Sequence, residues 1–252
     1  IGELSEEQQA RADIRKLMRS LGLYETLNYT LTDKESLTKF AYLNSDKALA
    51  LEHPMTPVRA YLRLNLLPSL LETLSYNVSR QATDLAMFEI SHITSQKYKG
   101  EHLAFAYYGQ RKIQGELLKK PYDFYDAKGL IATLLDFLGL NESRYEFVAN
   151  TLYLDGGLHP MQSALLRVQG KIVGVFGKLH PTMQKDYGLN ADTIVGELNL
   201  AALLALKTGR QKVSAPPRFP FVSRDLALVV NRDLPVSELL KIVKAAGGKL
   251  VT

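Results

Sequence analysis

The chain has 252 residues, of which 46% are hydrophobic and 23% charged, and this balance excludes wholesale disorder and is typical of a folded globular protein. No apolar run approaches the roughly 20 residues that cross a bilayer, and no basic-then-apolar leader is present, so we expect neither a membrane segment nor a secretory signal. The sequence contains no cysteine, which excludes disulfides and thiolate metal sites and leads us to expect a cytoplasmic protein.

The net charge of +5 is compatible with a nucleic-acid partner. The basic residues are scattered, however, and the one loose cluster consists of Lys207, Arg210, Lys212, Arg218 and Arg224. Scattered basic residues usually belong to a solvated surface, so direct RNA binding by this chain alone is the less favoured interpretation. The chain starts without a methionine and stops just after a Gly-Gly pair, which leads us to expect a fragment of a longer protein.

The first helix is predicted over residues 5–21. Ser5 and Gln8 form a capping box at its start, and Gly22 follows its last turn. Four apolar residues fall on one face, as expected of a helix that packs on a core or on a partner: Ile14, Leu17, Met18 and Leu21. A strand-like run, TLNYTLT, follows over 26–32.

The segment 51–80 begins extended because His53 and Thr56 each precede a proline. Pro68 then fits the first turn of a helix, whose buried side is predicted to consist of Leu67, Leu70, Leu71, Leu74 and Val78. Two neighbouring strands are expected after it, joined by the polar segment SQKYKGE, and they cover 85–94 and 103–109.

A third helix is predicted over 125–138, ended by Gly139, with core positions at Ile131, Leu134, Leu135 and Leu138. More strands follow, and then a short helix capped by Asn199. Because strands outnumber crossover helices, we predict an α+β fold with an antiparallel sheet.

The polar, proline-rich residues 207–218 are the predicted linker between this sheet and a second segment. Beyond them, RDLALVV at 224–230 is predicted to be a half-buried strand because apolar and polar residues alternate. A helix follows, with Pro235 near its start and Gly247 past its end.

Leu-His-Pro occurs twice, at His159 and His180. A two-residue hairpin turn at 169–170 would place these histidines opposite each other. Each precedes a proline, which lacks the donor that a strand ladder needs, so each copy marks the end of a strand and a structural role is favoured. A metal pair stays open because Asp155 and Asp186 are nearby in the sequence, although no HExxH motif supplies a further ligand.

The remaining candidates form no catalytic constellation. His53, His92 and His102 are isolated and are expected to be structural or surface residues. Asp123 and Asp126 lie at a helix start, where capping and the helix dipole explain them. The sequence has neither a G-x-S-x-G nucleophile motif nor a glycine loop that cradles phosphate. We therefore assign no catalytic, cofactor-binding or metal-binding residue.

Several segments, taken in order, resemble the bacterial phenylalanyl-tRNA synthetase β-subunit family: LGLYETLNYTLT, HPMTPVRAYLRLNLLPSLLETLSYNVSR, MFEIS, FYDAKG, GLHPMQSA, GKLHP, GELNL and RFPFVSRDLALVV. The resemblance runs along essentially the whole chain. It implies a class II aminoacyl-tRNA synthetase-like module at 1–206, the linker at 207–218, and the truncated start of a ferredoxin-like anticodon-binding domain at 219–252. The repeated LHP pattern recurs in that family, and this favours a structural role for the two histidines.

The resemblance also implies partners and cofactors. In the family, the β chain assembles with an active α subunit into an α₂β₂ heterotetramer that charges tRNA-Phe, and ATP and Mg²⁺ serve the whole enzyme. Amino-acid specificity lies on the α subunit, and the first helix with the strand after it is expected to form a subunit interface. Two alternatives remain: a free-standing class II-like ATP-dependent ligase and a stand-alone RNA-binding protein.

The arginines that hold phosphate in active class II enzymes are missing from the matching positions. Ser95 stands where an arginine ends a motif strand, and neither His92 nor Lys97 supplies the planar guanidinium fork. The stretch GELNLAA at 196–202 keeps one glycine of the third motif but not its arginine, and Glu197 would repel a triphosphate. This chain alone is therefore predicted to be catalytically inactive and to bind no cofactor.

Overall fold

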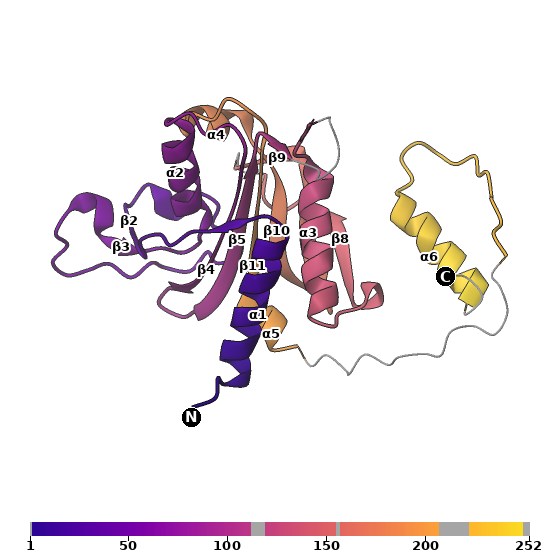
Figure 1. Cartoon of the computed structure of the whole chain (residues 1–252), viewed down its shortest axis with the longest axis horizontal. Helices are drawn as coiled ribbons and strands as arrows, with labels where there is room; N and C mark the ends of the chain where they lie inside the picture. The colour runs from indigo at the N-terminus through magenta and orange to yellow at the C-terminus, as the bar shows by residue number, and fades with distance from the viewer. Residues whose placement is uncertain (1, 112–118, 155–156, 207–221, 249–252) are drawn as a thin grey trace. The chain divides into compact units, whose positions relative to one another are not determined.

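The computed structural model describes residues 2–111, 119–154, 157–206 and 222–248 (Figure 1). The chain divides into two compact units, Ile1–Gln211 and Lys212–Thr252, and each is described by itself. None of the described helices is long and apolar enough to cross a membrane.

The first unit is built on a large sheet, which has seven strands among the described residues. In spatial order they are β1 (Tyr24–Glu25), β4 (Leu85–Thr94), β5 (Lys99–Tyr108), β11 (Thr193–Asn199), β10 (Lys171–Leu179), β9 (Leu158–Val168) and β8 (Tyr145–Ala149). Neighbouring strands are antiparallel except for β1 and β4, which are parallel. The predicted α+β class with a mainly antiparallel sheet is therefore confirmed.

Smaller elements complete the described part of this unit. β2 (Leu31–Thr32) pairs with β3 (Tyr61–Leu62), and Figure 1 shows this pair protruding to the left of β4. The other short elements are β6 (Gln110–Arg111), β7 (Lys120–Pro121) and the 3-10 turns η1 (Ser36–Thr38), η2 (Pro57–Arg59) and η3 (Glu142–Arg144).

Helices cover both faces of the sheet (Figure 1). On one face, α1 (Glu6–Ser20), α3 (Phe124–Phe137) and α5 (Leu200–Leu204) contribute to a core that also contains Phe88, Phe105 and Phe176 from the strands. On the other face, the leucines of α2 (Leu67–Val78) form a second core, against which α4 (Pro181–Asp186) packs through Met183. Polar side chains on the strands beneath α2 must therefore find partners inside the protein.

The helix ends follow the predicted signals. Ser5 Oγ accepts from the Gln8 backbone N–H at 3.3 Å, and Gln8 Oε1 accepts from the Ser5 N–H at 2.9 Å, so the capping box is confirmed. Gly22 follows this helix with φ +88°, the left-handed conformation that glycine adopts without strain. Asp123 caps α3 with Asp126 at the third position, and Asn199 caps α5, as predicted.

Two predicted boundaries in the first unit are wrong. The run 26–32 is not one strand: within it the structure assigns only β2, Leu31–Thr32, to a strand, although the Thr26 N–H still donates to Phe88 O on β4 at 2.8 Å. The polar segment 95–101 is not all loop, because β5 already begins at Lys99. Tertiary partners make this possible, since Arg11 on α1 pairs with the buried Glu101 carboxylate at 2.7 Å.

The second unit contains α6 (Val236–Gly247), with Pro235 as its N-cap residue. Gly247 is the last residue of this helix, not the residue beyond it, and Gly248 follows with φ +53°. The predicted strand at 224–230 is wrong: the structure assigns no strand to these residues and their side chains are exposed. A strand needs a ladder partner, and residues 222–248 supply none. The predicted linker 207–218 lies outside the described residues.

Candidate functional site

Ser95, which stands where the resemblance expects an arginine, is buried in the turn between β4 and β5. Its hydroxyl donates to Asp46 Oδ2 at 2.8 Å, and the Lys97 backbone N–H donates to the same oxygen at 2.6 Å. The hydrogen bond from Ser95, followed by those from backbone N–H groups, lowers the pKa of the Asp46 carboxyl. The turn therefore holds a carboxylate of the chain itself, and a second anion would be repelled there.

Gly196, the one glycine of the third class II motif that this sequence keeps, packs against aromatic rings of the core. A Cβ atom added at Gly196 would lie 2.4 Å from Phe105 Cζ and 2.8 Å from Phe176 Cβ. Both phenylalanines are fully buried. On the face of the sheet covered by α1 and α3, the space beside this glycine is therefore filled by side chains of the chain and is not open to a ligand.

Glu197, predicted to repel a triphosphate, is buried and bonded to two partners inside the protein. Its Oε1 lies 2.6 Å from His102 Nδ1. Its Oε2 accepts from the Leu66 backbone N–H at 2.9 Å, at the start of α2. An anion at a helix start is stabilised by the free N–H groups there. His102 is therefore a structural residue, as one of the two expected roles has it, but it is not isolated, because its fully buried ring contacts Glu197.

A second bond fixes the orientation of the His102 ring. Tyr98 Oη lies 3.2 Å from His102 Nε2, and Tyr98 also has a side-chain hydrogen bond with Asn199. Because the Glu197 carboxylate can only accept, His102 Nδ1 carries the hydrogen and donates to it, and in the neutral ring Nε2 accepts from the Tyr98 hydroxyl. Burial raises the pKa of Tyr98, so its hydroxyl stays protonated and remains a hydrogen-bond donor.

A second buried carboxylate, Glu89 on β4, faces the same side of the sheet. Arg63 binds it with both terminal nitrogens, Nη2 to Oε1 at 2.6 Å and Nη1 to Oε2 at 3.3 Å. Asn28 Nδ2 donates to Oε2 at 2.7 Å, and Thr73 Oγ1 on α2 donates to Asn28 Oδ1 at 2.5 Å. Arg63 is only 3% exposed and binds Glu89 through both terminal nitrogens, so it is not available to a phosphate.

The two Leu-His-Pro copies perform the same local task. His159 Nδ1 accepts from the Met161 N–H, and His180 Nδ1 accepts from the Thr182 N–H, both at 3.2 Å. His180 is thereby the N-cap of α4. Identical use of both rings to cap a backbone N–H supports the structural interpretation.

The predicted pairing of these histidines across the hairpin is wrong. The turn at 169–170 forms as predicted, with Lys171 opposite Val168. Two register shifts farther along then place Leu179 opposite Leu158, and the His180 N–H donates to Gly157 O at 3.1 Å. Extra residues in a bulge offset a ladder in this way. His180 therefore lies opposite Gly157 instead of His159.

The other candidate residues are dispersed. His53 and His92 are exposed, and Asp123 and Asp126 form the cap of α3. Asp155 lies outside the described residues. Within the described ranges, no three histidine or carboxylate side chains are placed to hold a metal ion.

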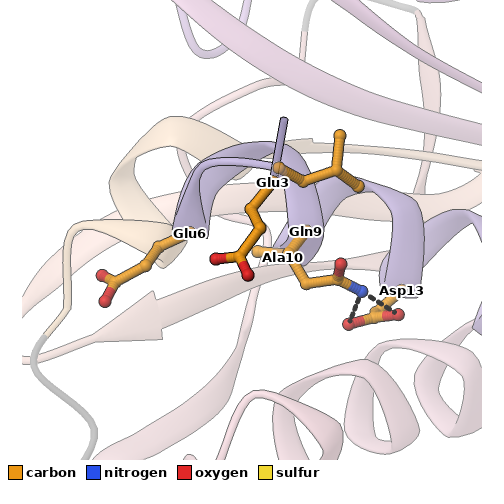
Figure 2. Close-up of a pocket in the computed structure, with 6 residues that line it drawn as sticks. Glu3, Glu6, Gln9, Ala10 and Asp13 are labelled. Carbon is orange, nitrogen blue, oxygen red and sulfur yellow. Dashed lines mark hydrogen bonds between the residues drawn. The ribbon is translucent and has the colours of Figure 1, made fainter. Parts of the chain in front are cut away.

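A shallow surface depression lies at the start of α1 (Figure 2) and is lined by Glu3, Leu4, Glu6, Gln9, Ala10 and Asp13. The Gln9 amide donates to both Asp13 oxygens, at 3.0 and 2.9 Å. Its charged lining is entirely acidic, so it offers nothing that would neutralise phosphate. We assign no ligand to it.

Large apolar side chains are exposed on two neighbouring segments at the β1 side of the sheet. We call these the edge surface: Tyr24, Leu27, Tyr29, Met55 and Val58. The two segments are joined by the Arg63 N–H, which donates to Thr30 O at 3.0 Å, and by Arg59, whose guanidinium lies 4.8 Å from the Tyr29 ring centroid. Clustered exposed apolar residues are typical of a protein interaction site.

The fold is shared with solved aminoacyl-tRNA synthetases. A pyrrolysyl-tRNA synthetase from Desulfitobacterium hafniense, PylSc, matches with a TM-score of 0.59 at 14% identity, over 79% of this chain and 68% of the other. A crystal structure of pyrrolysyl-tRNA synthetase from the same organism gives a TM-score of 0.55 at 13% identity, over 78% and 67%. The first unit therefore has a class II aminoacyl-tRNA synthetase-like fold; at such low identity, the likeness shows the fold alone.

The family follows from the sequence comparisons. The family model described as "Phenylalanyl tRNA synthetase beta chain CLM domain" matches residues 1–200, and the chain belongs to this family. Phenylalanine–tRNA ligase beta subunits are similar over nearly all of it: 35% identity over 99% of this chain in Bacillus subtilis (strain 168), and 34% over 99% in Staphylococcus aureus (strain MRSA252). The chain spans 31% of the length of these relatives.

Proposed function

We propose that this chain is the class II-like, non-catalytic module of the β subunit of a phenylalanine–tRNA ligase, and that its role is to assemble with a catalytic α subunit. The observation that carries the proposal is the space on the α1 and α3 face of Gly196, which Phe105 and Phe176 fill so closely that an added Cβ would lie 2.4 Å from the nearest ring atom. The free-standing ligase is disfavoured for the same reason.

The chemistry of aminoacyl-adenylate formation supports placing catalysis on the α subunit and assembly on this chain. Forming an aminoacyl adenylate joins a carboxylate to the α-phosphate of ATP and expels pyrophosphate, so fixed cations must hold the phosphates. At the matching positions this chain has Ser95 beside the Asp46 carboxylate, and its buried guanidinium, Arg63, is neutralised by Glu89. These residues do not fit ATP with Mg²⁺, so we place both on the α subunit and derive no catalytic step for this chain.

The edge surface is the proposed contact with the α subunit. Leu27 is 88% exposed and Tyr29 72% exposed, and a stable obligate interface is expected to bury residues of this kind. The sequence-based expectation placed the interface on the first helix and the strand after it. In the structure the inner face of α1 is committed to the core through Ile14 and Met18, so we assign the contact to the segment after α1.

The remaining proposals concern the whole enzyme, its location and the domain boundaries of this chain. We propose that tRNA-Phe binds through an α₂β₂ assembly in the cytoplasm, and that 1–206 forms the module, 207–218 a linker and 219–252 the start of a ferredoxin-like domain. The division of the chain after Gln211 supports a boundary inside that linker.

Co-expression with the cognate α subunit tests the proposal. The two chains are expected to co-purify, and Leu27→Glu is expected to abolish co-purification, because a charge would be buried in an apolar contact. Leu152→Glu is the matched control, since Leu152 is also exposed but follows β8 at the opposite edge of the sheet. Failure of the unmodified chain to co-purify with the α subunit would contradict the proposal.

Calorimetric titration with ATP and Mg²⁺ tests the inactive assignment separately. No heat of binding is expected for this chain at micromolar to millimolar nucleotide. Binding in the micromolar range would instead favour the free-standing ligase, and salt-dependent binding of bare tRNA would favour the RNA-binding alternative.

A further inference from the structure

The residue between the two most exposed apolar side chains of the segment 26–30 points the opposite way from them. Leu27 and Tyr29 face solvent, whereas Asn28 turns inward onto Glu89 and Thr73. Asn28 uses its backbone N–H as well, which lies 3.4 Å from Glu89 Oε1. One inward amide thus fixes the direction of both outward side chains.

Glu89 is well suited to hold this amide in place. It lies in the middle of β4, is 1% exposed, and receives Arg63 on both oxygens while Asn28 donates to the same two atoms. A carboxylate can accept four such bonds, whereas a glutamine of the same shape has one acceptor oxygen and would point an N–H₂ group at Arg63.

Arg63 is fixed in turn by the start of α2. Its Nη1 donates to Ser69 Oγ at 2.8 Å, and Ser69 Oγ donates to Leu66 O at 3.1 Å. Leu66 is the residue whose N–H binds Glu197. The anchor of Asn28 is therefore continuous with the buried network beneath α2 and cannot shift without disturbing it.

Tyr29 is held from the outside as well. Arg59 stacks on its ring and donates through Nη1 to Leu31 O at 3.1 Å, so the guanidinium bridges the ring and the backbone. An aromatic side chain fixed before binding loses little conformational entropy when a partner covers it.

We infer that Asn28 and Glu89 are positioning residues for subunit association: they hold Leu27 and Tyr29 outward as a preformed anchor for an apolar pocket on the α subunit. The inference rests on the proposed function and adds the residues that orient the contact without touching the partner. It predicts that inward-facing polar residues control affinity for the partner.

The test measures the dissociation constant of the full chain for the cognate α subunit. Asn28→Ala and Glu89→Gln are each expected to weaken it by about tenfold or more, because the anchor loses its fixed orientation. The matched control is Asn150→Ala: Asn150 is a buried loop amide that bonds Ser163 and Tyr153 beside the opposite edge, and its loss is expected to leave the affinity unchanged.

A double-mutant cycle separates positioning from general destabilisation. Removing Tyr29 by Tyr29→Ala is expected to cost less affinity in an Asn28→Ala background than in the unmodified chain, because the ring is no longer held for binding. Amide exchange at residues 26–31 is expected to accelerate in Asn28→Ala and not in Asn150→Ala.

Different results overturn different statements. If the unmodified chain does not bind the α subunit, the proposed function fails and the inference with it. If the unmodified chain binds, but Asn28→Ala weakens affinity no more than Asn150→Ala or adds independently to Tyr29→Ala, the positioning role alone is wrong.

Discussion

Replacing Gly196 with alanine tests whether this position serves core packing. The added Cβ would lie 2.4 Å from Phe105 Cζ, about 1 Å closer than the 3.4 Å at which ordinary contact begins. Because Phe105 is fully buried, the ring cannot move into solvent, and overpacking of this kind costs about 1–3 kcal/mol. Alanine loses less backbone entropy on folding than glycine, which offsets about 0.5–1 kcal/mol. A net loss of about 1–2 kcal/mol is expected.

Urea unfolding of the full chain, followed by circular dichroism, measures this loss. Gly129→Ala is the control, since nothing lies within 4 Å of a Cβ there on the exposed side of α3, and it is expected to stabilise by about 0.5–1 kcal/mol. Combining Gly196→Ala with Phe105→Leu is expected to cost less than the two changes added together. An unchanged unfolding free energy for Gly196→Ala, or strict additivity with Phe105→Leu, would refute the packing argument.

Two further predictions concern local carboxylates. Asp123→Ala is expected to lower the unfolding free energy by about 1 kcal/mol in a urea titration, because the Tyr125 and Asp126 N–H groups at the start of α3 lose their acceptor; no change would show that the cap is dispensable. The pKa of Asp46 is lower in the folded state, so its stabilisation is present above the unfolded pKa of about 4 and is lost as pH falls through the folded value. The stability difference between the unmodified chain and Asp46→Asn is therefore expected to be constant from about pH 5 to 8 and to shrink in more acidic urea titrations, and a difference independent of pH down to about 3 would contradict it.

Features set by near neighbours in the chain could be predicted from the sequence. The capping box at Ser5, the cap at Asp123 and the strand Leu85–Thr94 match their patterns, because each depends on a few adjacent residues. The hairpin turn at 169–170 was predictable for the same reason. The pairing farther along was not, since the register shifts come from bulges that no turn residue announces.

The buried polar network was missed for a different reason. Single charged residues within apolar runs, such as Glu89 in LAMFEIS and Glu197 in GELNL, were a usable signal, because a buried carboxylate requires a partner. The partners themselves come from far along the chain: Arg63 is 26 residues from Glu89, and Leu66 is 131 residues from Glu197. Pairings between residues so far apart in the sequence are set by the tertiary fold, and no pattern of neighbouring residues indicates them.

The order of the strands has a consequence for synthesis of the chain. Among the described strands of the sheet, β11 is the last to be made, yet it lies between β5 and β10 and joins the two halves of the sheet. Until residue 199 has left the ribosome, β5 and β10 each present an unpaired edge, and such edges are where nascent chains aggregate. The first unit therefore cannot fold stepwise from its N-terminus while it is being synthesised. Its sheet is completed only when the seven residues of β11 have left the ribosome.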